Sequence, residues 1–582
     1  MKATRNVVRE INRAVDGPII LAGLEHRLII KSTGTVASTR ANTDGIDGVP
    51  STAWIITNKG TVSSTGGWGI NLAGAGVLIN SGAITGASGG FEAGSSSKVT
   101  NKGTISGGSL FSGTGIRLGD GGSITNGQGG SISGGDAGAQ IAGGPGTVIN
   151  KGTIAGFFIS VDLLAGGAVA NEGRINGGIF GGVRILNDPG SVTNKGSITS
   201  GGAFGIELDA GGSVTNNEGG SIFGAGFGIQ SATGFGKVVN NGTISGGTDG
   251  LRIFSGTAAV TNRGTIDGGL AGIELNAGNI TNHKGGLISG RQLGISLFNG
   301  PGAVTNDGTI RGFQEGIGLL TGVGTITNDT SGSISGEEVG VEVFSGSGTV
   351  TNAGTISGGT HSVLFDSGST GSRLVIRPGA VFIGSADATS ATDSTIELTK
   401  GTASIAGIGL DRFIGFDSLL VDDEARWALN DSNTIGTVLN NGNVEVSGEL
   451  IVGAAVDPNS TGVFVLDRGS ILQVAAALGQ STKMNFHVGS ELVVEDFRLF
   501  GQHIGTRNYT GPLLEDFRGS EIDLKGFDTT GMQAVFSGGS GLLQLTNSTL
   551  QMATLDFGKP GLGGGTLHFA SDGSGGALIT CL

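Results

Sequence analysis

Apolar and polar residues alternate in short segments that recur along much of this chain, and the recurrence predicts its fold. The segment VTNKGTI at residues 99–105 has near copies at 148–154, 192–198, 260–266 and 350–356. Successive copies lie about 22 residues apart, the period of a solenoid in which each repeat forms one coil. One asparagine occupies the same place in every copy: Asn58, Asn80, Asn101, Asn126, Asn150, Asn171, Asn194, Asn216, Asn240, Asn262, Asn282, Asn306, Asn328 and Asn352.

Each repeat predicts three short strands. Val-Thr-Asn forms the first strand and Thr-Ile the second, and Asn-x-Gly forms the turn between them because Asn and Gly tolerate positive φ. A third segment follows, such as GIRL at 115–118 or GIEL at 205–208, in which apolar and polar residues alternate. The predicted fold is therefore all-β: a parallel β-helix with three short strands per coil and end caps. We expect the right-handed form, because parallel crossover connections prefer that hand.

The recurring asparagines have two structural interpretations. If the coils stack in register, the side-chain amides form an internal ladder that is hydrogen-bonded from coil to coil. Otherwise each asparagine stabilises only its own turn. Under both interpretations the asparagines are structural and not catalytic.

The middle positions of the third strands predict an outward row of polar side chains. A row of mixed sign reduces like-charge repulsion between neighbouring coils, whereas a stripe that binds polyanions would need one sign. We therefore interpret the row as a structural face. It comprises Arg117, Gln140, Arg184, Glu207, Gln230, Arg252, Glu274, Ser296 and Glu342.

Changes in pattern divide the chain into four parts. Residues 1–50 form an entry segment, 51–366 the regular repeats, 367–504 wider and looser coils, and 505–582 a C-terminal cap or secretion module. In the first part, the spacing of Val7, Val8, Ile11 and Val15 predicts a short amphipathic helix, as part of a polar cap or on a membrane surface. In the last part, LLQLT, MATLDF and TLHFAS predict strands of a small antiparallel module.

Composition limits the classes of partner and compartment. The chain has 582 residues, 119 of them Gly, and 37% are hydrophobic, enough for an ordered core. A net charge of −14 argues against a nucleic-acid partner. The single cysteine, Cys581, provides neither a disulfide framework nor a thiolate metal site. No apolar run is long enough for a transmembrane helix, and the N-terminal residues do not match a conventional secretory signal. Export by a C-terminal signal, a start further upstream and an internal location all stay open.

Groups that carry chemistry are sparse. Glu207 and Glu274 are expected three coils apart. The densest acidic group is Glu337, Glu338 and Glu342, near Glu315 and Asp329, and it is either a turn cluster or a carboxylate site.

Aromatic and metal-binding residues are similarly scattered. Trp54 and Trp68 suggest a small aromatic patch or a cap contact. Asp120, Asp136 and Asp572 fit turns better than calcium loops. The histidines have no metal-ligand spacing: His26, His283, His361, His487, His503 and His568. No catalytic, cofactor or metal site is expected.

The VTN-x-GTI repeats with GIxL strands resemble the passenger regions of bacterial autotransporters and adhesin-like β-helix proteins. EIDL at Glu521 and FASDGSGGALIT at Phe569 are similar to the ends of large surface proteins thought to leave by type I secretion. An autotransporter ends in a membrane barrel of about 250 residues, and no room for one follows the repeats here.

The resemblance implies a secreted or cell-surface β-solenoid, without catalysis, that attaches to surface glycans or proteins. The alternatives are a carbohydrate-active β-helix enzyme and a phage tailspike-like protein.

Overall fold

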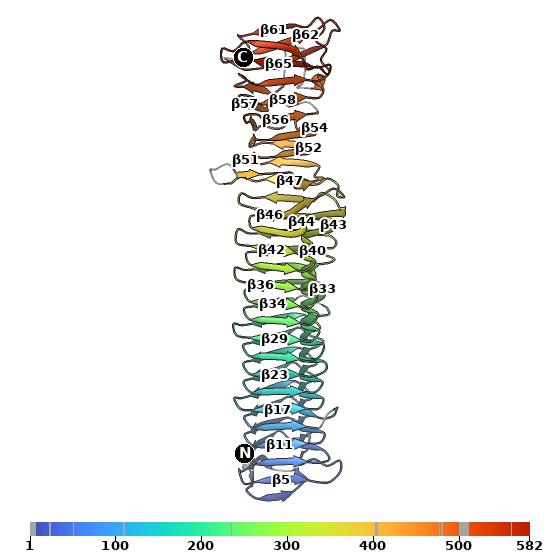
Figure 1. Ribbon diagram of the computed structural model, residues 1–582. Coiled ribbons are helices and arrows are strands. Elements are labelled where there is room, and N and C mark those ends of the chain that lie inside the picture. Colours follow the sequence, from blue (N-terminus) through green and yellow to red (C-terminus); the bar gives the residue numbers. More distant parts are fainter. Residues whose placement is uncertain are drawn as a thin grey trace, which may run out of the picture. The chain divides into compact units, whose positions relative to one another are not determined.

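The computed structural model describes residues 7–22, 25–50, 52–108, 111–233, 236–401, 406–475, 478, 481–499, 511–559 and 562–582. Short strands follow one another throughout (Figure 1), and the one helical segment of these residues is the 3₁₀ turn η1 (Phe497–Leu499). The chain forms two compact units, residues 1–318 and 319–582. This division falls inside the part predicted as regular repeats, 51–366.

The first unit is a parallel β-solenoid with the predicted three strands per coil. In one coil these are β19 (Gly146–Asn150), β20 (Thr153–Gly156) and β21 (Ile159–Leu163). Each strand pairs in parallel with its counterpart in the next coil, so β19 pairs with β22 (Gly167–Asn171) and Asn150 stands beside Asn171. The repeat period and the strand positions therefore agree with the sequence pattern.

Alternation determines what each strand buries. Val148, Ile154, Val161 and Leu163 are fully buried, while the residues between the apolar positions of β19 face outward. The third strands form one long side of the first unit. Those used below are β12 (Gly89–Ala93), β15 (Thr114–Leu118), β18 (Ala137–Ile141), β21, β24 (Gly181–Ile185), β27 (Phe204–Leu208), β30 (Phe227–Ser231), β33 (Asp249–Asn262), β35 (Ala271–Asn282) and β37 (Leu293–Leu297).

The helix predicted near the N-terminus is wrong. Residues Val7–Ile11 form strand β1, which pairs in parallel with β4 (Glu25–Ile30), and Ala14–Asp16 form β2. The segment VVREI is rich in β-branched residues, and β4 offers a ready pairing edge, so strand pairing outweighs the helical spacing. Residues 1–6 lie outside the described part of the chain.

The coils after residue 367 are not wider than those before. Arg373 pairs with Thr395 and Thr395 with Ser418, which are steps of 22 and 23 residues. Ser418 pairs with Thr437 and Arg426 with Asn443, which are steps of 19 and 17 residues. The bulky side chains fill the core without lengthening the coil, because Trp427, Phe464 and Phe486 are buried.

The C-terminal strands pair antiparallel, as predicted. β61 (Gln533–Ser537), β62 (Leu542–Thr546) and β63 (Met552–Asp556) form one antiparallel set. β65 (Ala577–Cys581) pairs antiparallel with both β60 (Glu521–Leu524) and β64 (Leu567–Ser571). The parallel stack of the second unit thus changes to hairpin pairing at its end.

Candidate functional surface

The asparagines form a buried ladder inside the first unit. From Asn58 to Asn306 each side-chain amide nitrogen donates to the Oδ1 of the next asparagine, at 2.7 to 2.9 Å. Asn150 also donates to the carbonyl oxygens of Gly152 and Arg174. Its Oδ1 accepts from the backbone N–H of Gly152. Each asparagine therefore bonds to the next coil and also stabilises its own turn.

The same arrangement occurs in the second unit. Asn328 Nδ2 donates to Asn352 Oδ1 at 2.9 Å, and both side chains are buried. Beyond this pair, the matching first-strand positions are Ile376, Leu398 and Val421, and the amide then returns at Asn440. The ladder ends where apolar residues replace asparagine.

The third strands carry a continuous polar row on the outside of the first unit. Side chains in the middle position pair from coil to coil in this order: Glu92, Arg117, Gln140, Asp162, Arg184, Glu207, Gln230, Arg252, Glu274 and Ser296. We call Glu92 to Glu274 the polar row. The mixed-sign row predicted from sequence is confirmed for this unit, and Glu342 of the second unit is buried.

Sequence reasoning omitted Glu92 and Asp162 from this row. Their strands read GFEA and SVDL, which lack the GIxL pattern. Counting a fixed distance from each ladder asparagine would have found both.

The strongest contacts in the polar row join Asp162 to its neighbours. Arg184 donates to both carboxylate oxygens of Asp162, at 2.9 and 3.1 Å, and Gln140 donates to Oδ2 at 3.2 Å. Asp162 is only 2% exposed. A buried carboxylate needs such charged donors, so this contact fixes the side chains of three successive coils.

A second cluster lies around Arg252. Its guanidinium is within 3.4 Å of Asp249 and 3.3 Å of Glu274. It also lies over the rings of Phe227 and Phe254, at 5.5 and 4.4 Å from their centroids. Burial raises the pKa of the Asp249 and Glu274 carboxyls, and Arg252 acts in the opposite direction on both.

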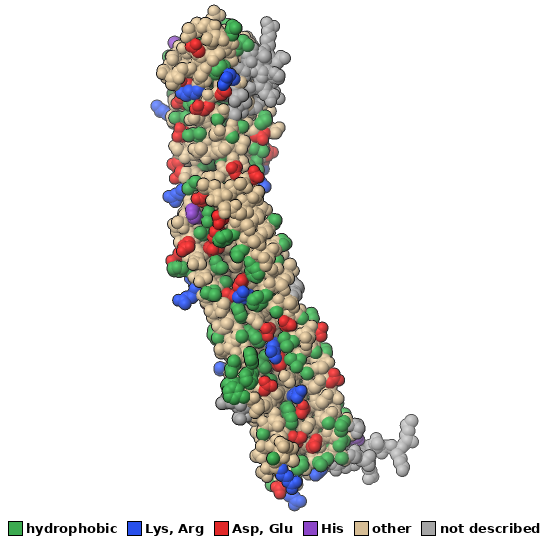
Figure 2. All heavy atoms as spheres, turned by 90° about the vertical axis from the view of Figure 1, so that its right-hand side faces the viewer, with side chains coloured by type: hydrophobic (Ala, Val, Ile, Leu, Met, Phe, Trp, Pro, Cys, Tyr) green, Lys and Arg blue, Asp and Glu red, His purple; other side chains and the backbone are tan. Residues whose placement is uncertain are grey.

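Aromatic side chains line one edge of this face, in the turns between second and third strands. We call Phe111, Phe157, Phe158, Phe180 and Phe227 the phenylalanine ridge. The rings of Phe111 and Phe157 are 4.9 Å apart, those of Phe157 and Phe158 5.4 Å, and those of Phe158 and Phe180 5.5 Å. Figure 2 shows hydrophobic side chains gathered beside a column of acidic and basic ones in this unit.

The backbone accommodates the exposed rings at some cost. Phe111 is 65% exposed and has φ of 75°, in the left-handed region that bulky residues rarely occupy. Phe204, buried beside the ridge, lies so close to Gly181 that a Cβ there would come within 1.9 Å of its ring. Sequence reasoning missed the ridge, although the Phe-Phe pair at a turn was a usable signal.

The other predicted candidates do not form a site among the described residues. Glu337 and Glu338 precede β43 (Val339–Asn352) in a turn, and Asp329 lies 3.9 Å from Arg377. Trp54 is buried, so it contributes to the core and not to a surface patch. No group of three or more His, Cys, Asp or Glu residues in the described part could hold a metal ion. His503 lies outside that part.

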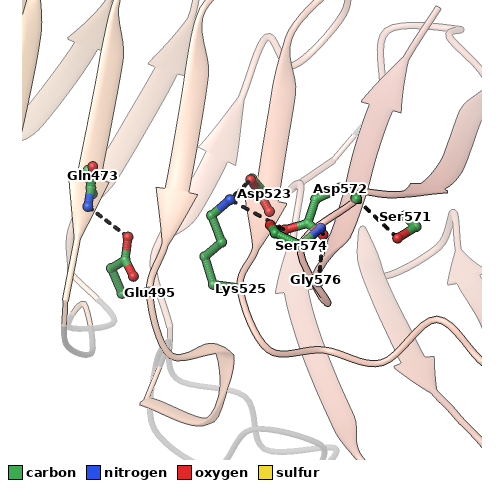
Figure 3. A network of polar contacts seen from close by, with 9 residues as sticks. Gln473, Glu495, Asp523, Lys525, Ser571, Asp572, Ser574 and Gly576 are labelled. Atoms are coloured by element: carbon green, nitrogen blue, oxygen red, sulfur yellow. Dashed lines mark hydrogen bonds and ion pairs between the residues drawn. The ribbon is translucent and has the colours of Figure 1, made fainter.

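Charged groups do gather at the C-terminal strands (Figure 3). Lys525 Nζ lies 2.6 Å from Asp523 and 3.3 Å from Asp572. Asp572, one of the aspartates considered for calcium, accepts hydrogen bonds from the backbone N–H groups of Ser574 and Gly576, both at 2.7 Å. Hydrogen bonds, led by that from the Ser574 side chain, hold the pKa of Asp572 well below its usual range. This network joins β60 to the turn before β65.

Comparison with protein families, curated proteins and solved structures finds no match to this chain. Among the described residues, no helix has the length and hydrophobicity required to span a bilayer.

Proposed function

We propose that this chain is a non-catalytic scaffold of a bacterial surface or of its surroundings, which holds binding groups for attachment to glycans or proteins. The observation that carries the proposal is the stack of coils fixed by a buried amide ladder. Each coil adds one rung of hydrogen bonds and one set of buried apolar residues, as Asn150 and Val148 illustrate. Such a stack presents its turns at regular intervals on a stiff support.

The turns between second and third strands support this proposal. They vary in sequence from coil to coil while the strands stay constant. The turn at 157–158 is Phe-Phe, the turn at 179–180 is Ile-Phe and the turn at 313–314 is Phe-Gln. Phe180 and Phe313 are exposed. Variable side chains on a constant support are typical of binding surfaces.

Two measurements test the proposal. Antibodies against the solenoid would be applied to intact cells, culture medium and lysate, with a cytosolic protein as control. Adherence of the cells to glycan-coated and protein-coated surfaces would then be compared with and without the gene, and with purified chain as competitor. Protein outside the cell and reduced adherence without the gene are expected. Protein confined to the cytosol, or unchanged adherence, contradicts the proposal.

A carbohydrate-active enzyme is the second candidate, because Asp249 and Glu274 converge on Arg252 beside two aromatic rings. Paired carboxyl groups of different environment are what glycoside hydrolysis requires. Purified chain would be incubated with a panel of polysaccharides while new reducing ends are measured. Cleavage that Asp249→Asn and Glu274→Gln abolish would favour the enzyme over the scaffold.

A further inference from the structure

The polar row and the phenylalanine ridge lie side by side along the third strands of the first unit, and together they are self-complementary. The row has Arg184 near its middle, with Asp162 on one side and Glu207 on the other. Outward from there, Gln140, Arg117 and Glu92 follow in one direction. Gln230, Arg252 and Glu274 follow in the other. The chemical order is thus nearly the same when read from either end.

From this order we propose that the face pairs with the same face of a second copy of the chain, with the coils running in opposite directions. A two-fold axis parallel to the strands, between Arg184 and Glu207, reverses the coil order and keeps both ridges on the same side. Each Arg184 then lies opposite Glu207 of the partner subunit. Each Arg117 lies opposite Glu274 of the partner subunit, and Asp162 and Arg252 each lie opposite an amide.

Charge accessibility selects this register. Arg117 and Arg184 have 49% and 31% of their side chains exposed, and Glu274 has 24%. They have capacity for partners beyond their own chain. Moving the axis one coil towards the N-terminus makes buried Asp162, which Arg184 already binds, the partner of Arg184. An axis through Arg184 itself opposes like charges, Asp162 to Glu207 and Arg117 to Arg252. Like charges in such positions are strongly unfavourable.

The phenylalanine ridge fits the same register. Reversal of the coils places Phe157 and Phe158 opposite Phe227 of the partner subunit, and Phe111 opposite Leu270 of the partner subunit. Leu270 is an exposed residue of the equivalent turn. Pairing therefore covers exposed aromatic side chains that would otherwise stay in water. An association that sets apolar turns against apolar turns and cations against anions is an isologous interface.

The size of the face suits a stable pair. Nine side chains spaced one strand apart extend for about 38 Å, and a five-residue strand is about 17 Å long, so each copy would cover about 650 Å². The total of about 1,300 Å² lies within the range of specific protein interfaces. Two sheets that pack face to face keep their strands nearly aligned, as this arrangement requires.

The test is the oligomeric state of the full chain, measured by sedimentation equilibrium, with charge swaps at the two ends of the row. Arg117 and Glu274 lie seven coils apart and cannot touch within one chain. We expect Arg117→Glu alone and Glu274→Arg alone each to raise the dimer dissociation constant at least tenfold. The double variant should restore it to within about threefold, because the swapped charges again oppose each other across the interface.

Two further variants control for folding and for position. Lys151→Glu reverses a charge in an equally exposed ion pair, that with Glu172, away from the third-strand face, and should leave the constant unchanged. Phe111→Asp removes a ridge side chain at a positive φ that Asp tolerates better than Phe. It should weaken the pair without lowering the melting temperature.

A monomer at all concentrations overturns the proposal, as does a dimer that the single swaps leave intact. A monomer that binds a polysaccharide through the ridge would instead assign the face to a glycan.

Discussion

Each ladder asparagine has two roles, which its two side-chain atoms divide. Oδ1 of Asn150 accepts from its own turn, at the backbone N–H of Gly152, and from Asn126. Nδ2 donates to Asn171 Oδ1 at 2.8 Å and to two backbone carbonyl oxygens. The turn uses the acceptor, whereas the link to the next coil uses the donor. A substitution that keeps only the acceptor therefore separates the two roles.

Asn150→Asp should lower the free energy of unfolding at pH 7 by about 3 kcal/mol, because a buried carboxylate then faces three oxygen acceptors. Burial would raise the pKa of the new carboxyl. The loss should thus be small below the unfolded-state pKa of about 3.9 and should grow as the pH rises through the folded-state value. Denaturant unfolding at pH 4 and 7 would measure both effects. Asn279→Asp, at an exposed position of β35, is the matched control. Equal stability of the two variants would reduce the ladder to a series of independent turns.

Glu207 shows how partial burial makes the polar row sensitive to pH. Burial raises the pKa of its carboxyl, while the hydrogen bond from Gln230 and the charge of Arg184 act in the opposite direction. A raised folded-state pKa favours folding below the unfolded-state pKa, and this contribution is lost as the pH rises through the folded-state value.

Glu207→Gln should therefore stabilise the chain relative to the wild type at pH 8 more than at pH 4. The difference should be below about 1 kcal/mol, because water still screens the side chain. Unfolding curves at the two pH values would show it. Glu172→Gln, in an exposed ion pair, controls for the loss of a charge. A difference that shrinks as the pH rises would contradict this account.

At the scale of single elements, alternation and turn residues predicted the repeat strands well. The pattern Val-Thr-Asn-x-Gly-Thr-Ile specifies both strand phase and turn, and coil stacking reinforces it, because each strand has a counterpart of the same sequence. The segment at Val7–Ile11 has no such copy, and its spacing was equally compatible with a helix. Its pairing with β4, a long-range contact, decided the outcome.

The hairpin strands at the C-terminus depend on one buried charge network. Lys525→Met should leave Asp523 and Asp572, both nearly buried, without their shared cation. We expect a loss of about 2 kcal/mol, the scale of a hydrogen bond to a charged group. Limited proteolysis should then cut within 533–571 before the coils. Lys400→Met, which breaks an exposed pair with Glu424, should have little effect. Equal resistance of the two variants to protease would show that the network is dispensable.

At the scale of the whole molecule, the sequence predicted the solenoid but only part of the candidate surface. A repeat period survives insertions of a few residues, so the ladder could be counted from one copy to the next. The partners of a surface side chain depend instead on which residues stand one coil away. Asp162 became part of the polar row, and Phe157 part of the ridge, only once the register was known.

Independence of the coils gives the last prediction. Deletion of residues 151–171 joins Asn150 to Glu172-Gly173 and so preserves the Asn-x-Gly turn. The deletion also places Arg184 beside Gln140, which opposes no like charges. Because each coil contacts mainly its neighbours, the shortened chain should fold and unfold in a transition like that of the wild type.

Deletion of residues 151–161 removes half a coil and is the matched control. The remaining residues cannot close a three-strand turn, and the apolar positions of the next strand lose their register with the core. This variant should be insoluble or cut readily by protease, whereas removal of the whole coil should leave near-wild-type circular dichroism. Equal damage from both deletions would show that the stack folds as one indivisible body and not as repeated units joined by a common ladder.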